Sequence, residues 1–148
     1  MMNLKIKTFG QLTTKELYEI LRSRSEVFIV EMGIRVQDMD CDDYRSLHCF
    51  FEEDGRVVAY LRAYHMGEDS GAVKLGRVLA LDQGKGIGRQ LVERSLPEIW
   101  NRMGCEKFYL HAQKNAQGFY EKLGFQVVSD EFTEAGIPHV AMELKMEY

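Results

Sequence analysis

The sequence has few of the residues that mark secreted, disulfide-bonded proteins. Its 148 residues include only three cysteines, Cys41, Cys49 and Cys105, and no Cys-x-x-Cys pair. An odd set of separated cysteines fits reduced thiols better than a disulfide framework. Cys41, His48 and Cys49 match no common zinc-binding spacing and lack a fourth ligand, so we expect no bound metal.

Long apolar runs and an excess of positive charge are also missing. No stretch approaches the ~20 apolar residues that cross a bilayer, and the N-terminal MMNLKIKTFG has no hydrophobic signal core. We therefore expect a cytoplasmic protein that does not enter a membrane. The formal net charge is −4, which provides no electrostatic footprint for nucleic acid.

Low-complexity segments and internal repeats are absent, and the chain has only two prolines. An apolar content of 45% favours a folded globular chain, and 148 residues suit one domain of ordinary size. We therefore treat residues 1–148 as a single domain.

The stretch from Ala72 to Gly104 organises the chain. It begins with the apolar run AVKLGRVLAL, which lacks strict alternation and is typical of a strand buried on both faces. A glycine-rich turn, DQGKGIG, follows. Apolar residues then recur at helical spacing up to Gly104, which predicts a helix with a glycine C-cap. Because Pro97 lies inside it, we expect a kink near Glu93 to Leu96.

The position of these glycines has a chemical meaning. The first turn of a helix carries unpaired backbone N–H groups, and glycine lets a phosphate come close to them. The dinucleotide fingerprint Gly-x-Gly-x-x-Gly fails because Arg89 stands at its last position, and the Gly-x-x-x-x-Gly-Lys-Ser/Thr loop is absent. The remaining pattern, Gln83-x-x-Gly86-x-Gly88, on its own also fits an ordinary tight turn.

The regions on either side predict a strand-rich α/β chain. NLKIKTF predicts a first strand, and Thr13 with Glu16 forms a capping-box signature for a helix that reaches about Glu31. LHCFFEEDGRVVAYLRAYHM predicts two strands joined by a turn at Asp54 and Gly55. After the long helix we expect a parallel strand in CEKFYLHAQ, a short helix in NAQGFYEKLG, and two last strands in FQVVSD and IPHVAMELKM.

Two motifs in this order resemble the GNAT superfamily of N-acetyltransferases. Gln83-x-x-Gly86-x-Gly88 resembles its acetyl-CoA loop, and NAQGFYEKLGF, from Asn115 to Phe125, resembles its segment with an asparagine before Phe-Tyr-x-x-x-Gly-Phe. The order of expected elements also matches, so the resemblance covers nearly the whole chain. It implies an α/β (α+β) GNAT fold, a mixed central sheet of about seven strands flanked by about four helices.

Three further stretches resemble the ElaA-type branch of that superfamily. They are VFIVEMG, the acidic loop that ends at His48, and EAGIPHVAM. Met32 and Glu134–Ala135 stand where that branch usually has a glutamine and a Glu-Asp pair.

The resemblance implies an acetyl-CoA-dependent N-acetyltransferase that acts, without a metal, on a primary amine of a small molecule or peptide. The residues expected to contact acetyl-CoA are Val78, Leu79, Ala80, Gln83, Gly84, Lys85, Gly86, Ile87, Gly88 and Asn115. By motif match, Tyr120 would protonate the leaving thiolate, since a phenol and a thiol have comparable basicity. An aromatic residue that packs the short helix against the sheet is the other interpretation of Tyr120.

The acceptor amine also needs a base to take its proton. His139 is the candidate, because some GNAT enzymes with a similar Pro-His-x-x-Met stretch use that histidine, and imidazole titrates in the required range. A structural strand histidine is the alternative. Glu31, His48 and His111 are the other candidates, and we expect Glu31 and His48 to contact the acceptor.

Four aspartates crowd the expected loop at residues 34–45: Asp38, Asp40, Asp42 and Asp43. They form either a solvated surface or a cluster that faces the cleft and attracts a cationic acceptor. Two other functions stay open: a GNAT-fold module that binds acyl-CoA without turnover, against which the retained Tyr120 argues, and an α/β protein that binds another nucleotide at the same turn. No motif identifies the acceptor, and the sequence leaves a homodimer open.

Overall fold

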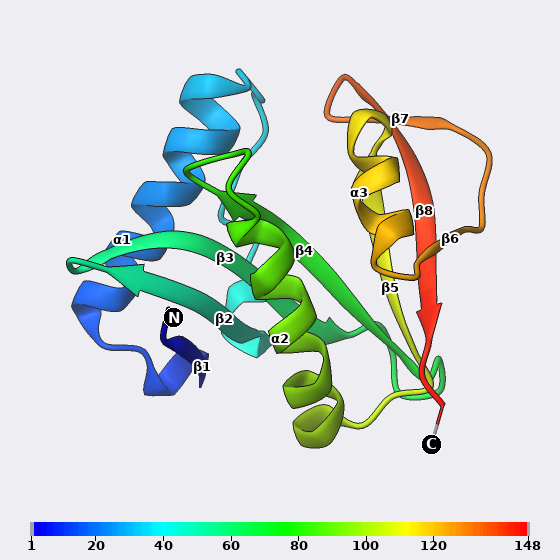
Figure 1. Cartoon of the computed structure of the whole chain (residues 1–148), viewed down its shortest axis with the longest axis horizontal. Coiled ribbons are helices and arrows are strands. Elements are labelled where there is room, and N and C mark those ends of the chain that lie inside the picture. Colours follow the sequence, from blue (N-terminus) through cyan, green and yellow to red (C-terminus); the bar gives the residue numbers. More distant parts are fainter. Residues whose placement is uncertain (1, 148) are drawn as a thin grey trace.

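The structure, a computed structural model that describes residues 2–147, is built around one β-sheet. The strands are β1 (Leu4–Thr8), β2 (Leu47–Glu53), β3 (Arg56–His65), β4 (Ala72–Ala80), β5 (Lys107–Gln113), β6 (Gln126–Val127), β7 (Phe132–Glu134) and β8 (Ile137–Lys145). Over the described residues they form one sheet in the order β1-β2-β3-β4-β5-β8-β6, with β7 paired to β8 outside this path (Figure 1). The predicted mixed sheet is confirmed, with one strand more than expected.

The β2–β3 hairpin turns at Asp54 and Gly55, as predicted, and both residues have the left-handed φ values, 51° and 77°, that such tight hairpin turns require. A second hairpin of this kind was not predicted. Ala135 (φ 52°) and Gly136 (φ 77°) connect β7 to β8. β7 therefore lies between the two last strands expected from the sequence, and the strand expected in FQVVSD is reduced to the two residues of β6.

Three α-helices occur within residues 2–147: α1 (Thr14–Arg24), α2 (Ile87–Met103) and α3 (Gln117–Lys122). The predicted capping box is confirmed, since the Thr13 hydroxyl accepts a hydrogen bond from Glu16 N–H and the Glu16 carboxylate accepts one from Thr13 N–H. α1 continues as a π-helical segment, Ser25–Glu31, so the predicted end near Glu31 is right although the last turns are not α-helical. Pro97 lies inside α2, which continues to Met103.

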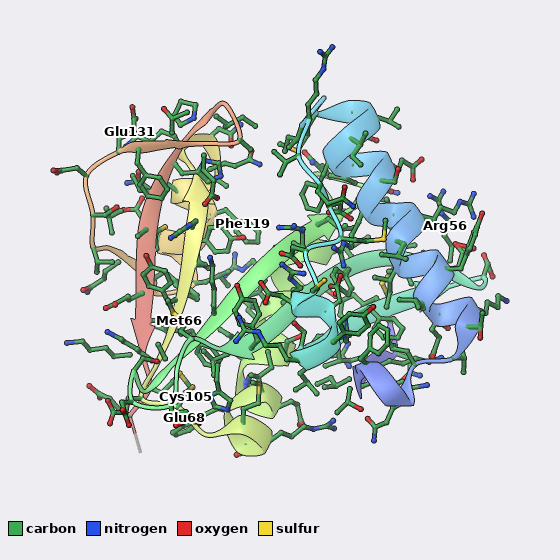
Figure 2. All side chains as sticks on the ribbon, turned by 180° about the vertical axis from the view of Figure 1, so that it is seen from behind. Arg56, Met66, Glu68, Cys105, Phe119 and Glu131 are labelled. Atoms are coloured by element: carbon green, nitrogen blue, oxygen red, sulfur yellow. The ribbon has the colours of Figure 1, made fainter. Side chains whose placement is uncertain are left out.

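Two apolar clusters cover opposite faces of the sheet. Leu91 of α2 and Tyr120 of α3 belong to the larger cluster, and Ile20 of α1 and Val27 of the π-helical segment belong to the smaller one. Figure 1 accordingly shows α2 and α3 in front of the sheet, and Figure 2, from behind, shows α1 over the other face. A surface helix buries the stripe of apolar residues that repeats every three or four positions, which explains this layering.

β4 and β5 are parallel, as predicted, but they pair only at their first residues, Ala72–Lys74 against Lys107–Tyr109. Among residues 2–147, no strand pairs with this edge of β4 beyond Lys74. Arg77 has a left-handed φ of 52°, and the register with β3 shifts beside it. Such a bulge bends and twists a strand, and the two strands diverge toward the top of Figure 1.

The three cysteines are free thiols, as predicted, and burial raises the pKa of the Cys49 thiol to about 12. Among residues 2–147, no helix is long and apolar enough to cross a membrane.

Glu16 connects α1 to β1 through charged contacts. Its nearly buried carboxylate lies 2.8 Å from Lys7 Nζ and 3.1 Å from Lys5 Nζ. Burial acts to raise the pKa of Glu16, but hydrogen bonds from Lys7, Thr13 N–H and Lys5 outweigh it and lower the pKa from 4.5 to about 2. Because the folded state binds this proton less readily than the unfolded state, Glu16 stabilises the fold above about pH 4.5, and this contribution is lost as the pH falls toward 2.

We predict that Glu16→Gln removes this pH dependence while its amide oxygen still accepts the Thr13 N–H. In urea titrations, the free energy of unfolding should fall less steeply between pH 4.5 and 2 in the variant than in the wild type. Glu93→Gln, which alters an exposed pair with Arg89, is the control and should keep the wild-type slope. An unchanged slope in Glu16→Gln would contradict the assignment.

Candidate functional site

The site predicted from the motifs lies where β4 separates from β5. Leu79 is buried toward α1, and Val78 and Ala80 pack at the margin of the larger cluster. All three follow the bulge at Arg77, so they lie on the part of β4 whose edge has no partner strand within residues 2–147. An unpaired strand edge presents backbone N–H and C=O groups that a ligand can bind.

The glycine turn between β4 and α2 is exposed and has the conformation that glycine favours. Gly84 has φ 88° and Gly86 φ 74°, and an added Cβ at either would meet no atom within 4 Å. Gly86 is the N-cap of α2, and no side chain caps the helix there. The first N–H groups of α2 therefore remain available to an anion, and Gln83 and Lys85 lie exposed beside them. The Lys85 ammonium also pairs with Asp82 at 2.9 Å.

The two sequence motifs meet at Gly88, in the first turn of α2. A Cβ placed on Gly88 would lie 3.6 Å from the Ala80 Cβ and 4.0 Å from Cζ of Phe119, in α3. The end of β4, the start of α2 and α3 therefore converge, although the motifs are far apart in sequence. Asn115 is exposed in a 3₁₀ turn, Lys114–Ala116, that precedes α3.

Tyr120 of α3 is nearly buried, with 8% of its surface exposed. Its ring meets those of Phe119 and Phe125 edge to face, at centroid distances of 5.0 and 5.8 Å. Within residues 2–147 no hydrogen bond to its hydroxyl is present, and burial raises the pKa of the phenol well above its usual value. Tyr120 is thus a core aromatic, as one interpretation required, and also a phenol that keeps its proton at neutral pH.

His139 lies on the opposite face of the sheet from Tyr120. It faces Gln113 across the β5–β8 ladder, whereas its neighbour Val140 belongs to the same cluster as Tyr120. Successive residues of a strand point to opposite faces, so the phenol and the imidazole approach the separated strands from opposite sides. The His139 Nδ1–H donates to the Ile137 carbonyl at 2.8 Å, and Nε2 lies 3.6 Å from the Glu134 carboxylate.

Glu134 joins His139 to His111, a contact that the sequence patterns did not predict. His111 Nδ1 donates to Glu134 Oε1 at 2.9 Å, and His111 Nε2 lies 3.0 Å from the Tyr109 hydroxyl. The signal in the sequence was the turn at Ala135 and Gly136, because a two-residue hairpin loop places the strand on its N-terminal side against the one that carries His139.

Of the predicted acceptor contacts, Glu31 is exposed at the end of the π-helical segment, next to Met32, whose Sδ lies 3.9 Å from Gln113 Nε2. The end of this segment therefore reaches the face of β5 that carries His111. His48 does not fit the role predicted for it: it is 1% exposed, and its two ring nitrogens bond to the Tyr60 hydroxyl at 2.6 Å and the Asp43 carbonyl at 2.9 Å. His48 is a structural histidine.

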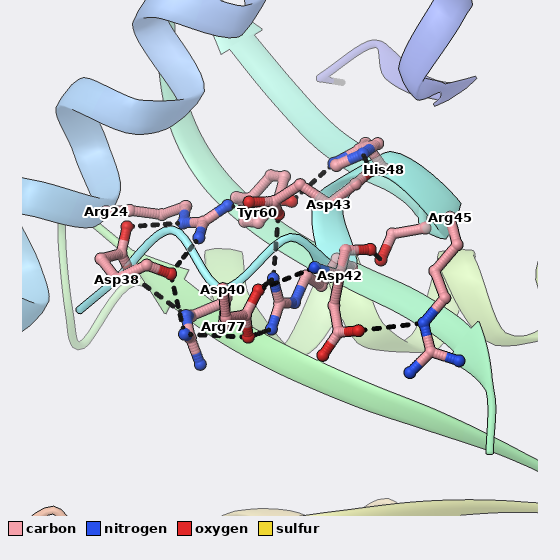
Figure 3. Close-up of polar contacts among 11 residues, drawn as sticks. Arg24, Asp38, Asp40, Asp42, Asp43, Arg45, His48, Tyr60 and Arg77 are labelled. Atoms are coloured by element: carbon pink, nitrogen blue, oxygen red, sulfur yellow. Dashed lines mark hydrogen bonds and ion pairs between the residues drawn. The ribbon is translucent and has the colours of Figure 1, made fainter. Parts of the chain in front are cut away.

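The acidic loop is held by arginines from three distant elements (Figure 3). Arg24, which ends α1 and is fully buried, donates to Asp43 at 2.7 Å and to Asp38 at 3.1 Å. Arg62 of β3 donates to Asp43 at 3.0 Å. Burial acts to raise the pKa of Asp43, but the hydrogen bond from Arg24 and the nearby charges outweigh it and lower the pKa.

The same network reaches the bulge of β4. Arg77 Nε donates to Asp38 Oδ1 at 3.0 Å, and Arg62 forms a double hydrogen bond to Asp40 at 2.6 and 2.8 Å. The Arg62 guanidinium holds the pKa of the Asp40 carboxyl well below its usual range. These carboxylates therefore already have arginine partners, which neither interpretation of the loop's composition predicted.

Among the described residues, no group of three or more His, Cys, Asp or Glu side chains is arranged to hold a metal ion.

Known proteins resemble this chain along nearly its whole length. A family model described as an acetyltransferase (GNAT) domain matches residues 25–146. The chain is 33% identical to protein ElaA of Escherichia coli over 137 residues, which cover 90% of each chain. The crystal structure of an acyl-CoA N-acyltransferase from Pseudomonas aeruginosa matches with a TM-score of 0.89 at 35% identity, over 97% of this chain and 99% of that one. The E. coli ElaA crystal structure has the same TM-score and coverage at 31% identity. The predicted superfamily and its ElaA-like branch are confirmed.

We predict that Asp43→Asn lowers the free energy of unfolding by about 3–5 kcal/mol, because the buried guanidinium groups of Arg24 and Arg62 would lose the carboxylate between them. Asp42→Asn is the matched control. It removes one charge from the same loop, but its partner Arg45 is exposed, so the loss should stay below about 1 kcal/mol. Denaturant titrations at pH 7 measure both values, and equal losses would show that the buried network has no special weight.

Proposed function

Because this chain belongs to the GNAT acetyltransferase family, we propose that it transfers an acetyl group from acetyl-CoA to a primary amine of a small molecule or peptide. The main support is the convergence at Gly88, where the end of β4, the start of α2 and α3 come together beside the unpaired edge of β4. The fold it shares with the P. aeruginosa acyl-CoA N-acyltransferase agrees with this assignment.

The residues present fit acetyl-CoA as a substrate. An uncapped helix N-terminus preceded by two left-handed glycines suits a pyrophosphate, which would be bound by the turn from Gln83 to Gly88. The pantetheine arm and the acetyl group would follow Val78 to Ala80. Backbone N–H groups of this strand edge would donate hydrogen bonds to the oxyanion that forms when the thioester carbonyl is attacked.

In the proposed reaction the amine nitrogen bonds to the carbonyl carbon, and the carbon–sulfur bond breaks with its electron pair going to sulfur. Tyr120 would give its proton to that thiolate, and its packing against Phe119 and Phe125 would hold the phenol in place. His139 would accept the proton of the attacking amine from the other face of the sheet. Glu31, exposed at the end of the π-helical segment, is the remaining candidate contact for the acceptor.

A module that binds acyl-CoA without turnover is the second candidate. The Tyr120 hydroxyl argues against it, because the packing contacts with Phe119 and Phe125 need only the ring, whereas turnover needs the phenol. A thiol-release assay with acetyl-CoA and a panel of primary amines decides between the two. Release of CoA that depends on an amine supports the enzyme, whereas tight CoA binding without release from any amine supports the module.

We predict that Gly86→Glu abolishes CoA binding, because the added carboxylate would lie among the N–H groups proposed for the pyrophosphate. Gly104→Glu is the control for backbone strain: Gly104 also has a left-handed φ, 66°, with no atom near an added Cβ, but it ends α2 at the opposite terminus. Isothermal calorimetry with CoA should give wild-type affinity for Gly104→Glu and no binding for Gly86→Glu. Unchanged affinity in Gly86→Glu would place CoA elsewhere.

We predict that Tyr120→Phe lowers kcat by roughly 10- to 10³-fold with little change in affinity for acetyl-CoA, because the variant loses the proposed acid but keeps the packed ring. Its thermal stability should also hold, since the hydroxyl has no hydrogen-bond partner in residues 2–147. Tyr18→Phe on the exposed surface of α1 is the control. A fully active Tyr120→Phe enzyme would return Tyr120 to a packing role alone.

A further inference from the structure

Side chains from β5, β7 and β8 meet at Glu134, on the face of the sheet away from α2 and α3. A carboxylate only accepts hydrogen bonds, so His111 Nδ1 is the donor to Glu134 Oε1, at 2.9 Å. His111 Nε2 is then free to accept from the Tyr109 hydroxyl, at 3.0 Å. The hydrogen bonds therefore run in one direction, from Tyr109 through His111 to Glu134, and they hold the carboxylate of a residue whose side chain is 47% exposed.

The second carboxylate oxygen of Glu134 faces His139. A carbonyl only accepts, so His139 Nδ1 carries the hydrogen donated to Ile137, and Nε2 is the nitrogen that can take up a further proton. Nε2 lies 3.6 Å from Glu134 Oε2. While the ring is neutral, a lone pair therefore faces a negative charge; once Nε2 is protonated, the contact becomes an ion pair.

The Phe132 ring packs against both histidines. It lies opposite His139 in the β7–β8 ladder and stacks on that ring at 6.0 Å, and it meets the His111 ring edge to face at 5.0 Å. The aromatic ring thus lies against both imidazoles while Glu134 bridges their nitrogens.

We propose that Glu134 is a positioning residue. Its carboxylate stabilises the imidazolium that forms when His139 accepts the proton of the acceptor amine, and His111 keeps that carboxylate turned toward His139. This inference rests on the proposed function, in which His139 is the base. As the carbon–nitrogen bond forms, the proton leaves the amine for His139 Nε2, where Glu134 Oε2 stabilises the imidazolium. His139 then releases the proton to solvent beside the exposed Glu134 side chain.

Glu134 is the main charged group beside His139 and His111. Within residues 2–147 it is the only carboxylate in contact with His139 or His111. The next one along β8, Glu143, pairs with Lys107 at 2.9 Å. The neighbours from β5 are Tyr109, His111 and the uncharged Gln113.

The test compares Glu134→Gln with Glu131→Gln, which removes an exposed carboxylate from the same segment without touching either histidine. In the first arm, NMR follows the ring C–H signals of His139 against pH in the protein without substrate. Loss of the facing charge should move the midpoint of the His139 titration to lower pH in Glu134→Gln, and the control should not move it.

In the second arm, kcat/KM for acetyl transfer is measured against pH with an amine that the panel identifies. The acidic limb should shift by the same amount and in the same direction in Glu134→Gln, and its plateau should fall about 3- to 10-fold because a less basic imidazole accepts the proton less readily. Glu134→Asp, which keeps the charge, should restore part of the wild-type midpoint.

The outcomes separate the two proposals. A His139 midpoint that is the same in Glu134→Gln and the wild type overturns the role of Glu134, as does a fall in activity that is equal at every pH. A shifted NMR midpoint together with a wild type that acetylates no amine supports the Glu134–His139 contact and overturns the proposed function. A midpoint and an acidic limb that shift together support both.

Discussion

The separation of β4 from β5 is the constraint on which the site depends. Parallel strands normally continue to pair along their length, but here the bulge at Arg77 turns β4 away after three residue pairs. A left-handed conformation costs a non-glycine residue about 1–2 kcal/mol. Arg77 offsets this cost through its side chain, which donates to the Asp38 carboxylate at 3.0 Å and to the Asp38 carbonyl at 2.9 Å. The loop thereby helps to hold the strands apart.

The buried arginines extend this coupling to the rest of the N-terminal half. Arg24 comes from the end of α1, Arg62 from β3 and Arg77 from β4, and all three bind carboxylates of one loop. Burying so many charges is costly unless every one is paired. The pairing joins helix, loop and bulge, so the end of the π-helical segment and the strand edge proposed to bind the thioester hold a defined relative position.

The two faces of the sheet divide the proposed chemistry. The face covered by α2 and α3 carries Tyr120 in an apolar cluster, where the phenol stays protonated. The other face carries His139, with a half-exposed carboxylate beside it. An acid for the leaving thiolate and a base for the entering amine act best on opposite sides of the reacting carbon, and the parity of the β5–β8 ladder supplies that arrangement without any long-range motif.

Local sequence determined the features that depend on neighbouring residues only: the capping box at Thr13, the turn at Asp54 and Gly55, and the glycine turn between β4 and α2. Each follows from backbone conformation or nearby hydrogen bonds, which the residue types dictate. Tertiary structure decided the rest. Asp38 found its partners in arginines of α1 and β4, His48 became buried, and Glu134 reached His111 only because β7 folded against β8. Burial and charge pairing depend on which distant residues the sheet brings together, and a sequence pattern contains no record of that.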